Sequence, residues 1–107
     1  MSPPENPADD DRGDGAKWPH EASCTIVNTR GLHARAAAKF VRLAGTFDAE
    51  VVVEREGAEV PATSILGLMM LAASRGSTLA MVARGPEAEA ALRAIVTLVE
   101  RGFDETD

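Results

Sequence analysis

His33 and Arg35 place an imidazole two positions before a guanidinium in this 107-residue chain, a combination that suits group-transfer chemistry. An imidazole is a competent nucleophile near neutral pH, and a phosphoryl group on it stays reactive enough to be passed on. The guanidinium of Arg35 offers a planar fork of N–H donors that suits phosphate oxygens. Arg30 lies close enough in sequence to add a second cation. The pair therefore predicts phosphoryl relay, which a serine would perform poorly because it holds phosphate too tightly.

The position of His33 favours the same chemistry. The residue follows a turn at Gly31 and precedes an alanine-rich helix, so its ring should lie near the unpaired N–H groups of the first helical turn, which attract anions. An alternative is that His33 only caps the helix and that Arg35 is a solvated side chain. Spacing alone leaves both interpretations open.

Elements that could hold such a site follow from the periodicity of the first half of the chain. A strand is expected over 24–28, a helix from about His33 to Gly45, and two strands over 50–55 and 58–62 joined by a tight turn. Pro61 indicates an edge or irregular strand. The apolar face of the helix is Ala37, Phe40, Val41 and Ala44.

The second half predicts a short apolar helix over 65–73, a strand over 78–83, and a last helix that opens at 85–87 and ends at Gly102. The inward stripe of the last helix is Ala88, Ala91, Leu92, Ile95, Leu98 and Val99. The order βαββαβα predicts an α+β open-faced sandwich, with a four-stranded antiparallel sheet and three helices on one face.

The helix over 65–73 is apolar nearly all round, although a short helix can bury only one side against a sheet. We assign Leu68 and Leu71 to the core, and Ile65, Leu66 and Met69 to a docking patch, because exposed apolar clusters mark partner sites. An unusually deep core helix is the alternative.

Composition narrows the class of protein. Residues 1–22 are rich in Pro, Asp and Gly and predict a disordered acidic tail, followed by one domain over 23–103 and a short acidic tail over 104–107. The net charge of −6, without a Lys/Arg stripe, argues against binding to nucleic acid or membranes. No stretch reaches the length of a bilayer span, so we expect a cytoplasmic monomer.

The residues give little support for a metal site or for redox chemistry. Cys24 is the single cysteine and is expected to be a small buried strand residue. No cluster of cysteines or carboxylates at ligand spacing accompanies His33 and His20, which argues against a metal-binding domain. No metal and no cofactor are therefore expected.

Two motifs resemble one known family. The segment from Gly31 to Val41, GLHARAAAKFV, resembles the phosphorylation site of HPr, the histidine-containing phosphocarrier of the phosphoenolpyruvate-dependent phosphotransferase system. The segment from Thr63 to Leu71, TSILGLMML, resembles the regulatory-serine helix of that family. Both lie at the family spacing, and the resemblance covers about residues 23–103. The HARAA form and the LMMLAA run look closest to carriers of the nitrogen-related regulatory branch.

The resemblance implies that enzyme I phosphorylates His33 on Nδ1 and that a IIA-type domain then accepts the group. Arg35 would stabilise the phosphohistidine, and Arg30, Arg42 and the docking patch would contact partners. The chain would then be a carrier and cosubstrate rather than a stand-alone catalyst.

The resemblance further implies regulation at Ser64 by an HPr serine kinase/phosphorylase, although a serine there is also an ordinary helix N-cap. Two departures matter: Ala36 stands where the family usually has proline, and Thr63 stands where it commonly has lysine. A second hypothesis is a regulatory interaction module that acts mainly through Ser64 or through binding. Retention of both His33 and Arg35 argues against it.

Overall fold

The computed structural model describes residues 17–105, so most of the predicted tail over 1–22 lies outside the described residues. Four antiparallel strands form one sheet in the order β1-β4-β2-β3. Their bounds are β1 (His20–Thr25), β2 (Glu50–Arg55), β3 (Ala58–Pro61) and β4 (Thr78–Arg84). The helices are α2 (Ala34–Ala44), α3 (Ile65–Met70) and α4 (Ala88–Glu100), followed by the short turn η1 (Gly102–Asp104). The predicted βαββαβα order is confirmed.

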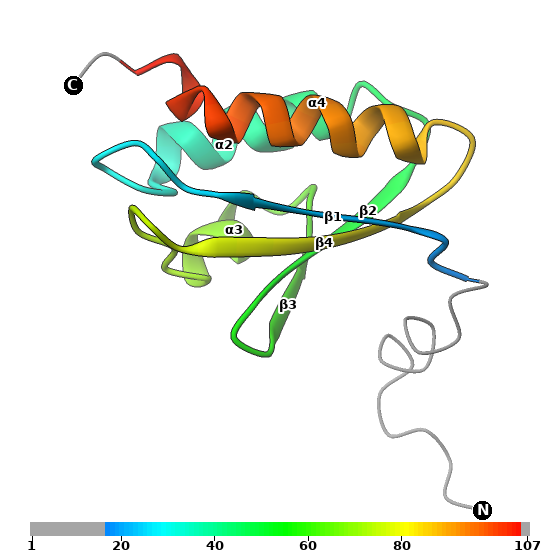
Figure 1. Cartoon of the computed structure of the whole chain (residues 1–107), viewed down its shortest axis with the longest axis horizontal. Coiled ribbons are helices and arrows are strands. Elements are labelled where there is room, and N and C mark those ends of the chain that lie inside the picture. The colour runs from blue at the N-terminus through cyan, green and yellow to red at the C-terminus, as the bar shows by residue number, and fades with distance from the viewer. Residues whose placement is uncertain (1–16, 106–107) are drawn as a thin grey trace, which may run out of the picture.

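Helices cover one face of the sheet, as the open-faced sandwich predicts. α2 packs against α3 and α4, while α4 lies over β1, β4 and β2, and Figure 1 shows α2 and α4 together above the strands. Alternate residues of the central strand β4 turn toward this layer, so Leu79, Met81 and Ala83 are buried. The opposite face of β4 stays partly exposed.

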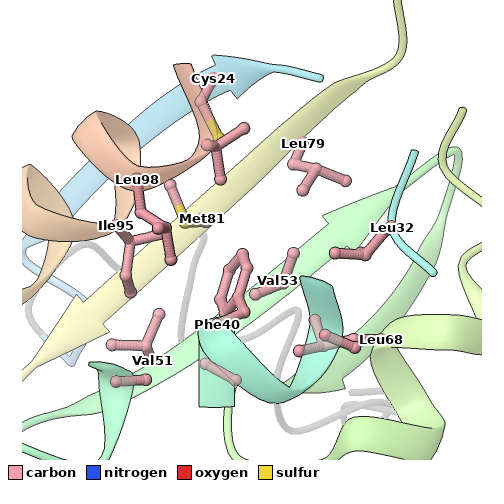
Figure 2. Close-up of a cluster of buried hydrophobic side chains, with 14 of the residues drawn as sticks. Cys24, Leu32, Phe40, Val51, Val53, Leu68, Leu79, Met81, Ile95 and Leu98 are labelled. Carbon is pink, nitrogen blue, oxygen red and sulfur yellow. The ribbon is translucent and has the colours of Figure 1, made fainter. Parts of the chain in front are cut away.

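Mainly aliphatic side chains, together with the rings of Phe40 and Phe103, make up the core. Phe40 of α2 is fully buried and points toward Val51 and Val53 of β2, with Ile95 and Leu98 of α4 nearby (Figure 2). All six residues of the predicted α4 stripe are buried. Leu68 and Leu71 are buried as predicted.

The first strand begins earlier than the sequence indicates. β1 starts at His20 rather than at residue 24, because it pairs with β4 along its whole length, from His20 opposite Ala83 to Thr25 opposite Thr78. The positions that alternate with exposed Glu21 and Ser23 are His20 and Ala22, which are only half-buried and weakly apolar, so the sequence shows little apolar alternation there. The domain therefore extends into the segment predicted as tail.

Trp18 also belongs to the folded part of the chain. Its side chain is 6% exposed, and the guanidinium of Arg84 lies 4.2 Å from the ring centroid. The indole supplies a large buried surface and a face for the cation. A lone aromatic beside a proline gives no such signal in sequence.

Two helix boundaries differ from prediction. α3 ends at Met70 instead of residue 73, because Ala72 adopts a left-handed φ of 55°. α4 begins at Ala88, and Pro86 lies in the preceding turn. Glu87 occupies the N-cap position of α4 without a side-chain capping bond. It fixes this turn instead, with its backbone N–H donating to Asp48 O at 3.0 Å and its carboxylate accepting from the Asp48 N–H at 2.6 Å.

Cys24 is a buried strand residue, as predicted. Burial, reinforced by the negative charge of Glu100, raises the pKa of its thiol to about 12. The thiol therefore stays protonated and unreactive near neutral pH. No helix in residues 17–105 is long and apolar enough to cross a membrane.

Candidate functional site

His33 is the N-cap of α2. Its backbone is extended, with φ −76° and ψ 179°, and its carbonyl accepts the first helical hydrogen bond, from the Ala37 N–H at 2.8 Å. The Arg35 N–H donates to His33 Nδ1 at 3.2 Å. Because Nδ1 accepts, its lone pair faces the N-terminus of the helix and the imidazole proton belongs on Nε2.

The first turn of α2 offers further donors beside Nδ1. The N–H groups of Ala34, Arg35 and Ala36 precede the first intrahelical bond, and within the described part of the chain only that of Arg35 has an acceptor. A phosphoryl group on Nδ1 would meet these N–H groups and the positive end of the helix dipole. Ala36 is buried at the place of the family proline and adds one N–H to this set.

The loop before His33 is held by backbone contacts. Gly31 has φ +67°, and a Cβ there would lie 2.6 Å from Ala73 O. The Leu32 N–H donates to that same carbonyl at 2.9 Å. The segment that follows α3 thus fixes where His33 leaves the loop.

The structure places the predicted arginines differently. Arg35 is exposed at the start of α2, beside His33. Arg30 is exposed in the preceding turn, and its charge acts on Glu105 next to His33. Arg42 is in the last turn of α2, roughly 13 Å along the helix axis from His33, so it can serve only a partner that spans the helix.

α3 presents the predicted docking patch to solvent. Ile65, Leu66 and Met69 are 41%, 67% and 39% exposed, and Met70, which the sequence analysis omitted, is 74% exposed. The Ser64 Oγ caps this helix by accepting from the Gly67 N–H at 2.9 Å. Among the described residues, apart from these four, Val27 is the other large hydrophobic residue that is exposed.

The short tail predicted over 104–107 contributes to the site. Asp104 is part of η1, and the Glu105 carboxylate accepts hydrogen bonds from Asn28 Nδ2 at 3.0 Å and from His33 Nε2. The sequence pattern marks neither Asn28 nor Glu105 as a site residue, because Asn28 falls at the end of the strand predicted over 24–28 and Glu105 falls in the predicted tail. A carboxylate 72 positions from the histidine gives no local signal.

Glu105 is held as a carboxylate. Burial opposes its charge, but the hydrogen bonds from Asn28 and His33, with attraction to His33 and Arg30, outweigh burial and lower the pKa of Glu105. No cluster of three or more His, Cys, Asp or Glu side chains suited to a metal occurs within residues 17–105.

Comparison with known proteins identifies the family of this chain. The family model described as "PTS HPr component phosphorylation site" matches residues 20–101. A phosphocarrier protein HPr of Cupriavidus necator is 47% identical over 81 residues, which cover 76% of this chain and 91% of that protein. A phosphocarrier protein NPr of Shewanella violacea is 46% identical over 85 residues, with 79% and 93% covered.

A solved structure shows the same fold. The HPr of Thermoanaerobacter tengcongensis is 40% identical, with a TM-score of 0.78 over 82% of this chain and 99% of that one. Family model, relatives and fold agree over the segment that carries His33. The chain therefore belongs to the HPr family, the phosphocarrier proteins of the phosphotransferase system.

Proposed function

We propose that His33 is the phosphoacceptor of this carrier, that enzyme I is its donor and that a IIA-type protein is its acceptor. The observation that supports this most directly is the lone pair of Nδ1, which faces the open N–H groups of α2 beside Arg35. A phosphoryl group there is stabilised by donors that are already in place. Each transfer is catalysed jointly with the partner, in the cytoplasm where enzyme I acts.

The partner surface follows from exposure. The apolar patch of Ile65, Leu66, Met69 and Met70 lies on α3, which packs on α2, the helix that begins after His33. Arg30 and Arg35 supply positive charge near His33 and Arg42 at the far end of α2. An acidic partner with an apolar centre fits this combination.

The nitrogen-related regulatory branch is the proposed context, supported by the HARAA and LMMLAA segments. Identity to relatives named HPr and NPr is nearly equal, at 47% and 46%. Phosphotransfer to purified IIA domains of the nitrogen-related and sugar-transport types tests the branch. Faster transfer to the sugar-transport type would contradict it.

Phosphorylation by enzyme I and phosphoenolpyruvate tests the carrier function. We expect an acid-labile phosphate on the wild-type chain and on His20→Ala, and none on His33→Ala. His20 is a matched control because it is the other histidine and lies on β1. Leu66→Ser should accept phosphate with a raised KM for enzyme I and an unchanged kcat. Labelling of His33→Ala would refute His33 as the acceptor.

A further inference from the structure

The chain takes a strained path just before Glu105. Gly102, Phe103 and Asp104 have φ values of 70°, 57° and 62°, so three successive residues adopt the left-handed conformation. That conformation is unfavourable for Phe103, because its Cβ approaches the following carbonyl oxygen, whereas glycine and aspartate adopt it more readily. Such strain persists where the surrounding structure enforces it, and it is typical of functional sites.

Three contacts enforce this path. The Phe103 side chain is fully buried, and Lys39 Nζ donates to the Phe103 carbonyl at 2.6 Å. The Arg101 guanidinium donates to both oxygens of Asp104, at 2.9 and 3.0 Å. The turn therefore fixes the direction in which Glu105 leaves it.

Glu105 then joins the loop and the imidazole. Asn28, which is buried, donates through Nδ2 to Gly31 O at 2.9 Å and to Glu105 Oε1 at 3.0 Å. The other oxygen, Oε2, accepts from His33 Nε2. The side chains of His33 and Glu105 are only 17% and 12% exposed, so solvent screens the pair weakly.

We propose that Glu105 is a positioning residue for phosphoryl transfer, which holds the imidazole proton on Nε2 so that Nδ1 remains the nucleophile. The proposal rests on the proposed role of His33 as phosphoacceptor. A carboxylate that accepts from one ring nitrogen fixes the tautomer and the orientation of the ring.

Glu105 differs from Arg35 in what happens during the reaction. The lone pair of Nδ1 forms the bond to phosphorus, and the donor's leaving atom keeps the electron pair of the bond that breaks. The Arg35 N–H must then release Nδ1 and can turn to a phosphoryl oxygen. The Nε2 proton stays in place, and the ring becomes a cation that Glu105 faces as an anion. Onward transfer reverses these changes.

Glu105→Gln tests the proposal with little change of shape. The Asn28 donor requires the amide oxygen to occupy the place of Oε1, so the amide NH₂ faces His33 Nε2 and favours the tautomer protonated on Nδ1. We expect the imidazole ¹⁵N shifts of His33 to show loss of the Nε2–H tautomer in the unphosphorylated protein. His20 gives an internal reference in the same spectrum, which also reports folding.

The rate of phosphorylation should fall together with the loss of the Nε2–H tautomer. We expect kcat for phosphorylation by enzyme I to fall about tenfold or more in Glu105→Gln, with KM little changed. Glu89→Gln makes the same exchange at an exposed carboxylate on α4, which pairs with Arg93 rather than with His33. This control should keep the wild-type tautomer and rate.

Three outcomes would overturn the proposal: an unchanged tautomer in Glu105→Gln, a loss expressed in KM alone, or an equal loss in Glu89→Gln. If Glu105→Gln does not fold, Glu105→Ala replaces it, and this variant should show mixed tautomers and a smaller fall in kcat. Failure of the wild-type chain to accept phosphate would refute the proposed function instead, while the tautomer measurement would still decide the role of Glu105.

Discussion

His33 acquires its chemistry from contacts on both ring nitrogens. The Arg35 N–H lies at Nδ1 and the Glu105 carboxylate at Nε2. The first contact is local, two residues along the chain, and the sequence predicts it from the helix start. The second depends on a residue 72 positions away, so no pattern around His33 could reveal it.

Gly31 sets the position of this site through a backbone approach. We expect Gly31→Ala to lower the free energy of unfolding by about 2–4 kcal/mol, because its φ is +67° and an added Cβ would collide with Ala73 O at 2.6 Å. Gly57→Ala is the matched control, since φ is +89° there but nothing lies within 4 Å. Urea unfolding measures both. Equal losses would show that conformation alone matters at Gly31.

The predicted regulation depends on α3, through its exposed apolar side chains and its N-cap, Ser64. It has six residues, too few to be stable without packing and capping. Leu68 anchors it in the core, and the Ser64 Oγ satisfies the Gly67 N–H. Apolar periodicity predicted the burial of Leu68 correctly. The end at Met70 escaped prediction because the segment must turn there to bring Ala73 O to the Leu32 N–H.

Ser64 variants separate capping from regulation. Ser64→Ala should lower the free energy of unfolding by about 1 kcal/mol through loss of the cap. Ser64→Asp retains a capping oxygen, so we expect near wild-type stability but slower phosphorylation of His33, because an anion beside the docking patch repels acidic partner groups. Initial rates with enzyme I and urea unfolding measure the two effects. Ser23→Asp, on an exposed site of β1, controls for net charge and should leave the rate unchanged.

Across the whole molecule, the two ends of the described chain have different roles. β1 forms one edge of the sheet, and Trp18, which precedes it, is buried. The C-terminal segment passes over the loop that precedes α2 and brings Glu105 to Asn28, 77 residues away. A segment predicted as an acidic tail is thus tied to the site.

The contacts of Glu105 with Asn28 and His33 predict a contribution to stability that is lost in acid. The folded state lowers the pKa of Glu105 from its ordinary value of 4.5, so the contribution is present above that value and is lost as pH falls through the lower, folded value. We expect the stability of the wild-type chain to decline more steeply from pH 5 to 3 than that of Glu105→Gln. Urea unfolding followed by Trp18 fluorescence measures both slopes. Parallel curves would contradict the prediction.

Local sequence patterns were enough to predict the element order, the buried stripe of α4, the helix start at His33 and the exposure of Ile65, Leu66 and Met69. These features depend on local periodicity and on capping, which act over one or two turns of chain. The residues around His33 also carried the family resemblance, which the comparisons confirm.

Long-range contacts, which local patterns do not reveal, set where β1 begins, where α3 ends, and what faces His33 Nε2. Edge pairing with β4 extends β1 into a polar segment, and the left-handed turn at Gly102–Asp104 brings Glu105 back to His33. These contacts join residues that are far apart in sequence, and they depend on the packed core around Phe103. Local sequence propensity cannot predict these contacts, because the acidic residues at the C-terminus have the composition of a tail.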